Sequence, residues 1–349
     1  MLVRRAWSGF LIFGAALCLV FAPVTAQQPP MSLLFTRIDS EISSLAPDSN
    51  LLIAEFKGSG CSTIHGQNEE TSLAIASVFK LYVLGELARQ VQLGQANWTD
   101  TIVLTDGLRS MPSGDFAYMP AGTKATVKEL AEAMIWVSDN TATDHLIDYL
   151  GRDNVQRAFQ AFGQRDPSAN APLLMTHEMF AIKMFQSQDW IDRYVSASDG
   201  EQLAMVATVI DPIKINPTGG WGIWNGPTAI DGIEWFASAS DLCRVSASLW
   251  AMGAQPGLAP VRSILTGNRG AVWDTAAFPM AGYKGGYEAG VVNATFVLQR
   301  ADGRVFFATA GFNTTQGVID QRAGIDQLVE IFGCLAVVAG EGGCADSAW

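Results

Sequence analysis

Three short strings of chemically capable residues follow one another along this 349-residue chain: Ser77-Val78-Phe79-Lys80, Ser138-Asp139-Asn140 and Lys284-Gly285-Gly286. A serine becomes a strong nucleophile when a base removes its proton, and a lysine with a lowered pKa is such a base. Positions i and i+3 share one face of a helix, so Ser77 and Lys80 lie within hydrogen-bonding reach if this segment is helical. The order and spacing of the three strings would let one site draw on three separate elements.

Each string alone has an ordinary structural explanation. Lys80 fits the surface of a helix, although its neighbours are mostly apolar. Ser, Asp and Asn are common in capped turns, and a Gly-Gly pair is common in hairpins. It is the ordered set that favours a catalytic site.

The ordered set resembles the S-x-x-K, S-D-N and K-T-G signature of the class A β-lactamase and penicillin-binding-protein superfamily of serine hydrolases. The resemblance covers nearly all of the chain after its N-terminal segment. It implies an α/β (α+β) fold in which an antiparallel sheet, formed by both chain ends and covered by helices, has an all-helical lobe inserted. We expect one domain over 27–349, with an α/β lobe of about 30–75 and 275–349 and a helical lobe of about 76–274.

Local patterns point to the same element order. Apolar residues at helical spacing predict helices over 32–45, 76–93, 176–186, 201–210, 239–252 and about 321–332, and two more within 126–151. Short apolar or alternating runs predict strands over 50–56, 291–299 and 304–312. Asp302-Gly303 is a hairpin turn signal between the last two strands.

The resemblance also assigns roles within the site. Ser77 is the residue that becomes acylated, Lys80 is its base, and Ser138 passes a proton to the leaving group while paired with Lys284. Substrate binding falls to Asn140, Gly285 and Gly286, since glycines allow the backbone to approach a ligand closely. The backbone N–H groups of Ser77 and Tyr287 form the oxyanion hole. Asp139 is expected to be structural.

Two departures from the signature bear on activity. Gly285 stands where the family usually has threonine, which removes a hydroxyl that would hold a substrate carboxylate. Class A enzymes also use a glutamate to activate the deacylating water, and the matching loop here, between Gly151 and Thr176, holds Asp166-Pro167-Ser168-Ala169-Asn170. Asp166 is a candidate deacylation acid, but it is shorter than glutamate and lies closer to Ser138 in sequence than expected.

Composition limits the remaining choices. A net charge of -12 without a Lys/Arg cluster argues against nucleic acid and against an anionic membrane surface. Residues 1–26 have the basic, apolar and small-residue segments of a signal peptide, and the apolar segment is short for a membrane span, so we predict export to the periplasm or medium without a stable membrane anchor. The four remaining cysteines then predict disulfides, for which we favour Cys334–Cys344 and Cys61–Cys243 among three pairings.

The sequence thus predicts an exported, monomeric serine hydrolase without metal or cofactor, acylated at Ser77 by an ester, amide or β-lactam. Esterase-like or slow acyl-hydrolase activity is favoured because the deacylation acid is uncertain. The alternatives are a true class A β-lactamase, a D,D-peptidase acting on cell-wall peptides, and a non-catalytic receptor for β-lactams or peptidoglycan. The histidines His65, His145 and His177 are too dispersed to suggest a metal site or a Ser-His-Asp triad. Trp221, Trp224, Trp235 and Phe236 either line a cleft or pack an insertion onto the helical lobe.

Overall fold

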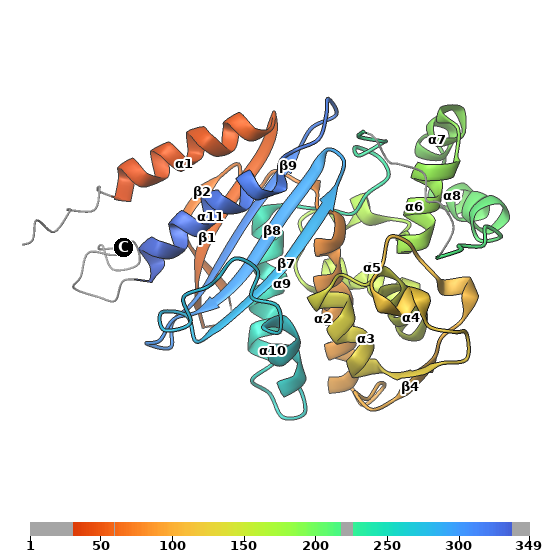
Figure 1. Ribbon diagram of the computed structural model, residues 1–349, viewed down its shortest axis with the longest axis horizontal. Coiled ribbons are helices and arrows are strands. Elements are labelled where there is room, and N and C mark those ends of the chain that lie inside the picture. Colours follow the sequence, from red (N-terminus) through yellow and green to blue (C-terminus); the bar gives the residue numbers. More distant parts are fainter. Residues whose placement is uncertain (1–30, 59, 218–225, 337–349) are drawn as a thin grey trace, which may run out of the picture.

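The two ends of the chain share one sheet in the computed structural model, which describes residues 31–58, 60–217 and 226–336 (Figure 1). The five strands are antiparallel and run in the order β2-β1-β9-β8-β7. Strand β1 (Asp48–Lys57) pairs with β9 (Val305–Asn313), so the N-terminal hairpin is joined to the C-terminal three-stranded meander. The other strands are β2 (Gly60–Gln67), β7 (Met280–Glu288) and β8 (Val291–Gln299). The predicted mixed α/β fold with an antiparallel sheet is confirmed.

Helices cover both faces of this sheet. Helices α1 (Met31–Leu45) and α11 (Gln321–Leu335) pack together on one face, and α9 (Ala239–Met252) packs on the other (Figure 1). Every residue of β9, and all but the last of β8, is consequently buried. Strands with two covered faces lack the clean alternation of a sheet exposed on one side, and these two strands consist mainly of apolar residues throughout.

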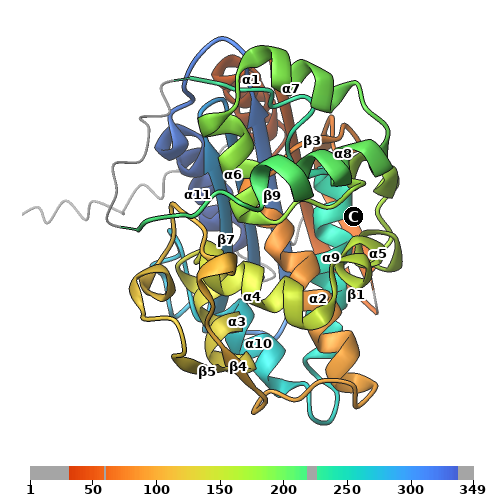
Figure 2. The same cartoon turned by 90° about the vertical axis from the view of Figure 1, so that its right-hand side faces the viewer.

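The helical lobe is built around α2 (Lys80–Gln92), most of whose residues are buried (Figure 2). Other helices pack against its apolar residues on several sides, as the mostly apolar sequence of α2 predicts. The helices of this lobe are α3 (Val127–Trp136), α4 (Asn140–Leu150), α5 (Arg152–Ala161), α6 (Thr176–Phe185), α7 (Gln188–Val195), α8 (Asp199–Met205) and α10 (Ala259–Leu265).

Two small sheets complete the lobe. Strand β3 (Leu73–Ala74) pairs with β6 (Phe236–Ala237), and β4 (Thr101–Val103) pairs with β5 (Lys124–Thr126). The first pair connects the segment just before Ser77 to the chain entering α9. It therefore helps to fix the start of the nucleophile segment.

The disulfide Cys61–Cys243 is present and joins β2 to α9. Cys243 is buried among apolar side chains between α9 and the sheet. The other predicted pair includes Cys344, which lies outside the described residues, as do the proposed signal peptide and Trp221 and Trp224. In the described ranges, we find no helix that combines the length and the hydropathy needed to cross a membrane.

Candidate active site

Ser77 lies on a tight turn at the junction between the two lobes. The segment predicted as one helix begins instead with the 3₁₀ turn η1 (Ala76–Phe79), and the α-helix α2 starts at Lys80. Ala76, directly before the serine, has a φ of 44°, a left-handed conformation that costs free energy for a residue with a Cβ. Packing holds the turn, because Phe79 stacks on Trp235 with ring centroids 3.8 Å apart. Trp235 is thus a core residue rather than part of the pocket lining.

Lys80 extends from α2 into the centre of the site and is fully buried. Its Nζ lies 3.2 Å from Ser77 Oγ, 3.0 Å from Ser138 Oγ, 2.8 Å from the Ser138 carbonyl oxygen and 2.5 Å from Asn140 Oδ1. Burial lowers the pKa of Lys80 to about 7, because the charged ammonium loses its hydration. The negative charges of Asp139 and Asp144 oppose this change. Near neutral pH a large share of Lys80 is therefore unprotonated and able to accept a proton from Ser77.

The turn Ser138-Asp139-Asn140 joins α3 to α4 and supplies the second wall. Ser138 adopts a left-handed φ of 58°, while its hydroxyl and its carbonyl oxygen both contact Lys80. Asp139 is buried and caps α4 by accepting a hydrogen bond from Ala142 N at 2.8 Å. It also accepts hydrogen bonds from Ser113 Oγ and Phe116 N. Asp139 thus orders the turn through these hydrogen bonds, in line with the structural role predicted for it.

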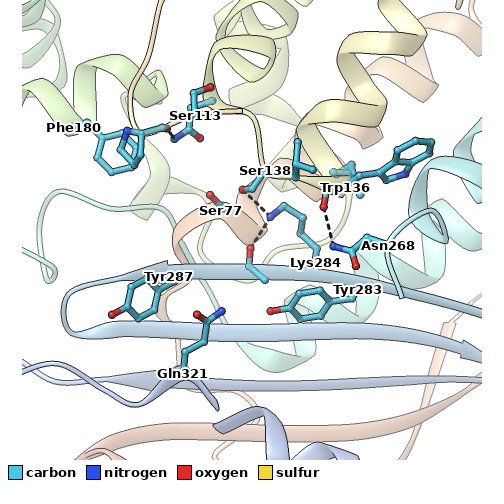
Figure 3. Close-up of a pocket in the computed structure, with 15 residues that line it drawn as sticks. Ser77, Ser113, Trp136, Ser138, Phe180, Asn268, Tyr283, Lys284, Tyr287 and Gln321 are labelled. Carbon is cyan, nitrogen blue, oxygen red and sulfur yellow. Dashed lines mark hydrogen bonds between the residues drawn. The ribbon is translucent and has the colours of Figure 1, made fainter. Parts of the chain in front are cut away.

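Lys284 projects from the edge strand β7 to the same hydroxyl. Its Nζ lies 3.0 Å from Ser138 Oγ and 2.6 Å from the Gly285 carbonyl oxygen (Figure 3). Burial lowers the pKa of Lys284 well below its ordinary value, and the nearby positive charge of Lys80 lowers it further. Ser138 Oγ lies between the two lysines, so a chain of hydrogen-bonded groups runs from Ser77 through Lys80 and Ser138 to Lys284.

Glycines allow β7 to lie against the nucleophile turn. A Cβ on Gly286 would lie 2.1 Å from the Ile75 carbonyl oxygen and 3.0 Å from Ser77 N, so no side chain fits there. Strand β7 ends the sheet, and an edge strand leaves alternate N–H groups outside the ladder. The oxyanion hole assigned to the N–H groups of Ser77 and Tyr287 stays a prediction that this close approach supports.

The pocket between the lobes has a volume of about 370 Å³. The predicted residues Ser77, Ser138, Asn140, Lys284 and Gly285 all line it, and so does Tyr287, whose side chain is 48% exposed. Sequence reasoning missed the rest of the wall, because these residues have no recognisable motif and are brought together only by folding. The missed lining residues are Pro112, Ser113, Ile135, Trp136, Val137, Phe180, Asn268, Tyr283 and Gln321.

Asp166 lies away from this lining. Its side chain is exposed and accepts a hydrogen bond from Ser168 Oγ at 2.5 Å, just before the 3₁₀ turn η4 (Pro167–Asn170). It is Asn170 that docks the loop, through hydrogen bonds with the backbone N and O of Phe236. Among the described residues, no carboxylate lines the pocket. The proposed role of Asp166 stays a prediction without a contact to support it.

One group of residues has the ligand atoms that a metal ion requires. Atoms of His177, Glu178 and Asp211 all lie within 4.8 Å of one another. Glu178, however, already pairs with Arg152, and His177 Nδ1 lies 2.9 Å from Asp144 Oδ2. Although burial opposes it, hydrogen bonds to the two aspartates raise the pKa of His177 to about 10, which favours an imidazolium that cannot bind metal. We interpret the group as an ion network that anchors α6 to α4.

Comparison with known proteins supports the family resemblance. The model of the β-lactamase enzyme family matches residues 57–207, which contain Ser77, Lys80 and the Ser138-Asp139-Asn140 turn. A comparison with curated proteins gives no match.

Solved structures with similar folds extend the comparison to most of the chain. A β-lactamase from Sphaerobacter thermophilus is 19% identical, with a TM-score of 0.60 over 86% of this chain and 93% of that one. A putative class A β-lactamase from Rhodopseudomonas palustris is 16% identical, with a TM-score of 0.59 over 86% and 99%. A point mutant of PBP-A, solved as an acyl-enzyme complex with penicillin G, is 16% identical, with a TM-score of 0.55 over 87% and 98%.

Proposed function

We propose that this chain, which is similar to the β-lactamase enzyme family in sequence and fold, is a serine hydrolase in which Ser77 attacks an ester, amide or β-lactam and the resulting acyl-enzyme is released slowly. The observation that carries the proposal is a contrast within one pocket. A buried lysine contacts the nucleophile at 3.2 Å, whereas no carboxylate of the described residues lines the cavity. The site therefore favours acylation over deacylation.

Acylation follows the hydrogen-bond chain. Neutral Lys80 takes the proton of Ser77 as the hydroxyl oxygen attacks the substrate carbonyl carbon. The developing oxyanion is stabilised by backbone N–H groups at the contact between η1 and β7. Ser138, held between Lys80 and Lys284, donates its proton to the departing oxygen or nitrogen and recovers one from Lys80. The proton lost by Ser77 thus reaches the leaving group.

Release of the acyl group needs a second base that activates water. Asp166 is exposed and outside the pocket. Two lysines with lowered pKa values lie at the site, but Lys284 contacts Ser138, and it is Lys80 that contacts Ser77. A lysine with a pKa of about 7 is able to activate water. It is positioned for the serine hydroxyl, however, and not for a water on the opposite side of the acyl group. We expect turnover of simple esters and slow hydrolysis of β-lactams.

A true class A β-lactamase is the alternative that the fold and the complete acylation set favour most. An acylated PBP-A mutant shows that a related fold forms an acyl-enzyme with penicillin G. The two candidates differ in a single rate, that of deacylation. Export is part of the proposal, supported by the Cys61–Cys243 disulfide and by the composition of residues 1–26.

Mass spectrometry of the intact protein mixed with benzylpenicillin, together with turnover of benzylpenicillin and 4-nitrophenyl acetate, tests the proposal. We expect a single adduct on Ser77, a burst of penicillin consumption close to one equivalent, and slow release afterwards. Ser77→Ala is the matched control and should form no adduct while keeping the fold. Rapid steady-state penicillin turnover would instead identify a β-lactamase, and adduct formation in the alanine variant would refute the role of Ser77.

A further inference from the structure

The space above Gly285 is occupied by another residue of the same strand. Tyr283 and Gly285 are two positions apart on β7, so they share a face. A Cβ on Gly285 would lie 2.1 Å from Tyr283 Oη and 2.6 Å from its Cζ. The tyrosine ring therefore lies along the strand and excludes any side chain at 285.

Packing fixes this placement of the ring. Tyr283 packs on Phe296 of β8 with ring centroids 4.7 Å apart, and its backbone N donates to the Asn268 carbonyl oxygen at 2.8 Å. A Cβ on Gly270 would lie only 2.6 Å from Tyr283 Cγ, so a second glycine makes room for the ring. Packing of the ring thus fixes the position of the Tyr283 hydroxyl.

The hydroxyl belongs to the pocket wall that also contains Lys284. Tyr283, Lys284, Gly285 and Gln321 all line the cavity, and Figure 3 shows the Tyr283 hydroxyl facing the side chain of Gln321. Burial raises the pKa of Tyr283, while its hydrogen bond with Gln321 opposes the change. The phenol consequently keeps its proton at neutral pH and acts as a hydrogen-bond donor.

We propose that Tyr283 is a specificity-determining residue that offers its hydroxyl to a carboxylate of the substrate, at the position that a residue-285 side chain would otherwise occupy. The inference rests on the proposed acylation of Ser77 and specifies one class of acyl donor for it. Such substrates carry an anionic carboxylate on the side of the scissile bond that faces β7. A phenol hydroxyl suits this acceptor because hydrogen bonds to charged groups are stronger than neutral ones.

The test compares benzylpenicillin with its methyl ester, which lacks the negative charge, in wild type and Tyr283→Phe. Phenylalanine keeps the ring packing and removes only the hydroxyl oxygen. We expect the second-order acylation rate constant for benzylpenicillin to fall roughly tenfold or more, and that for the methyl ester to fall less than about threefold. Unchanged rates for both substrates, or equal losses, would overturn the inference, since equal losses would mean a structural role.

A second set of variants tests the steric coupling between the two positions. Gly285→Thr should lower acylation by benzylpenicillin in the wild-type background, where the tyrosine ring blocks the new side chain. In the Tyr283→Ala background the same threonine should fit and restore part of the lost acylation. Additive losses would contradict the coupling. If wild type itself forms no adduct with any of these probes, it is the proposed function that fails, whereas a labelled wild type without acid preference refutes only the role of Tyr283.

Discussion

Replacing Lys80 by methionine should abolish acylation and at the same time make stability less dependent on pH. The folded state holds the pKa of Lys80 at about 7, against an ordinary value of 10.5. Between these two values the unfolded chain binds one proton more than the folded chain, so the stability of the wild type rises with pH across that window. Each pH unit adds about 1.4 kcal/mol to the free energy of unfolding, for a total of about 5 kcal/mol. Below pH 7 the destabilisation caused by burying Lys80 is complete and no longer changes with pH.

Urea denaturation at pH 7, 8 and 9 measures this effect. The free energy of unfolding of wild type should increase between pH 7 and pH 9 by about 2 to 3 kcal/mol more than that of Lys80→Met. The difference in slope is the decisive quantity, because the substitution also leaves Asn140 Oδ1 without its lysine partner and changes stability at every pH. Lys284 is present in both proteins, and above pH 7 wild-type Lys80 is mostly neutral and exerts little charge on it. Parallel pH dependences would refute the burial argument.

The same pKa predicts the pH profile of the chemistry. Acylation by the uncharged probe 4-nitrophenyl acetate should rise with pH to a plateau, with a midpoint near 7, since only neutral Lys80 accepts the serine proton. Lys80→Met should lose several orders of magnitude in acylation rate. A loss below about tenfold, or a wild-type profile flat through pH 7, would mean that Lys80 is not the base.

Three further outcomes are expected. Asp166→Asn should leave turnover of esters and β-lactams nearly unchanged, since the carboxylate is exposed and outside the pocket. A long-lived acyl-enzyme that appears only in this variant, with rapid turnover in wild type, would show that Asp166 activates the water. Replacing Cys61 and Cys243 together by alanine should lower stability by up to about 5 kcal/mol in the chain-entropy view, because the bridge spans 182 residues, and a change below about 1 kcal/mol in urea denaturation would argue against this bond. Gly286→Ala should reduce acylation at least about a hundredfold without loss of the fold, because the new methyl group pushes β7 from the Ile75 carbonyl; wild-type burst kinetics in that variant would contradict the close packing.

Local sequence signals were sufficient for the parts of the molecule whose structure depends on local chemistry. The bounds of α9 follow from helical periodicity and the capping serine Ser238, and those of β8 from a short, mainly apolar run. Strand β2 was missed because it is a mostly polar edge strand without alternation, and α7 and α10 because they have only 8 and 7 residues. Helix α5 was missed although its buried residues Val155, Ala158 and Phe159 lie at helical spacing. These elements are stabilised mainly by what they pack against.

The candidate site likewise has a part that local sequence predicts and a part that depends on tertiary packing. The reactive groups were predictable, because a Ser-x-x-Lys string places base and nucleophile together within one turn of chain. The place of Tyr283 in the pocket was not predictable, because its ring fills the space above Gly285 through packing that no motif reveals. The strained φ angles of Ala76 and Ser138, too, are set by tertiary contacts that no local pattern reveals.

Because β1 pairs with β9, the central sheet is complete only after the C-terminal strands have been made. The partner of β1 is made only after about 250 further residues, and Lys284 also comes late in synthesis. A nascent chain that ends before β7 therefore carries the nucleophile and its base but not the second lysine, and its N-terminal hairpin has an open edge. Such distant pairings make folding slow relative to helical packing. Reactivity toward acyl donors should accordingly appear only after the C-terminal strands have joined the sheet.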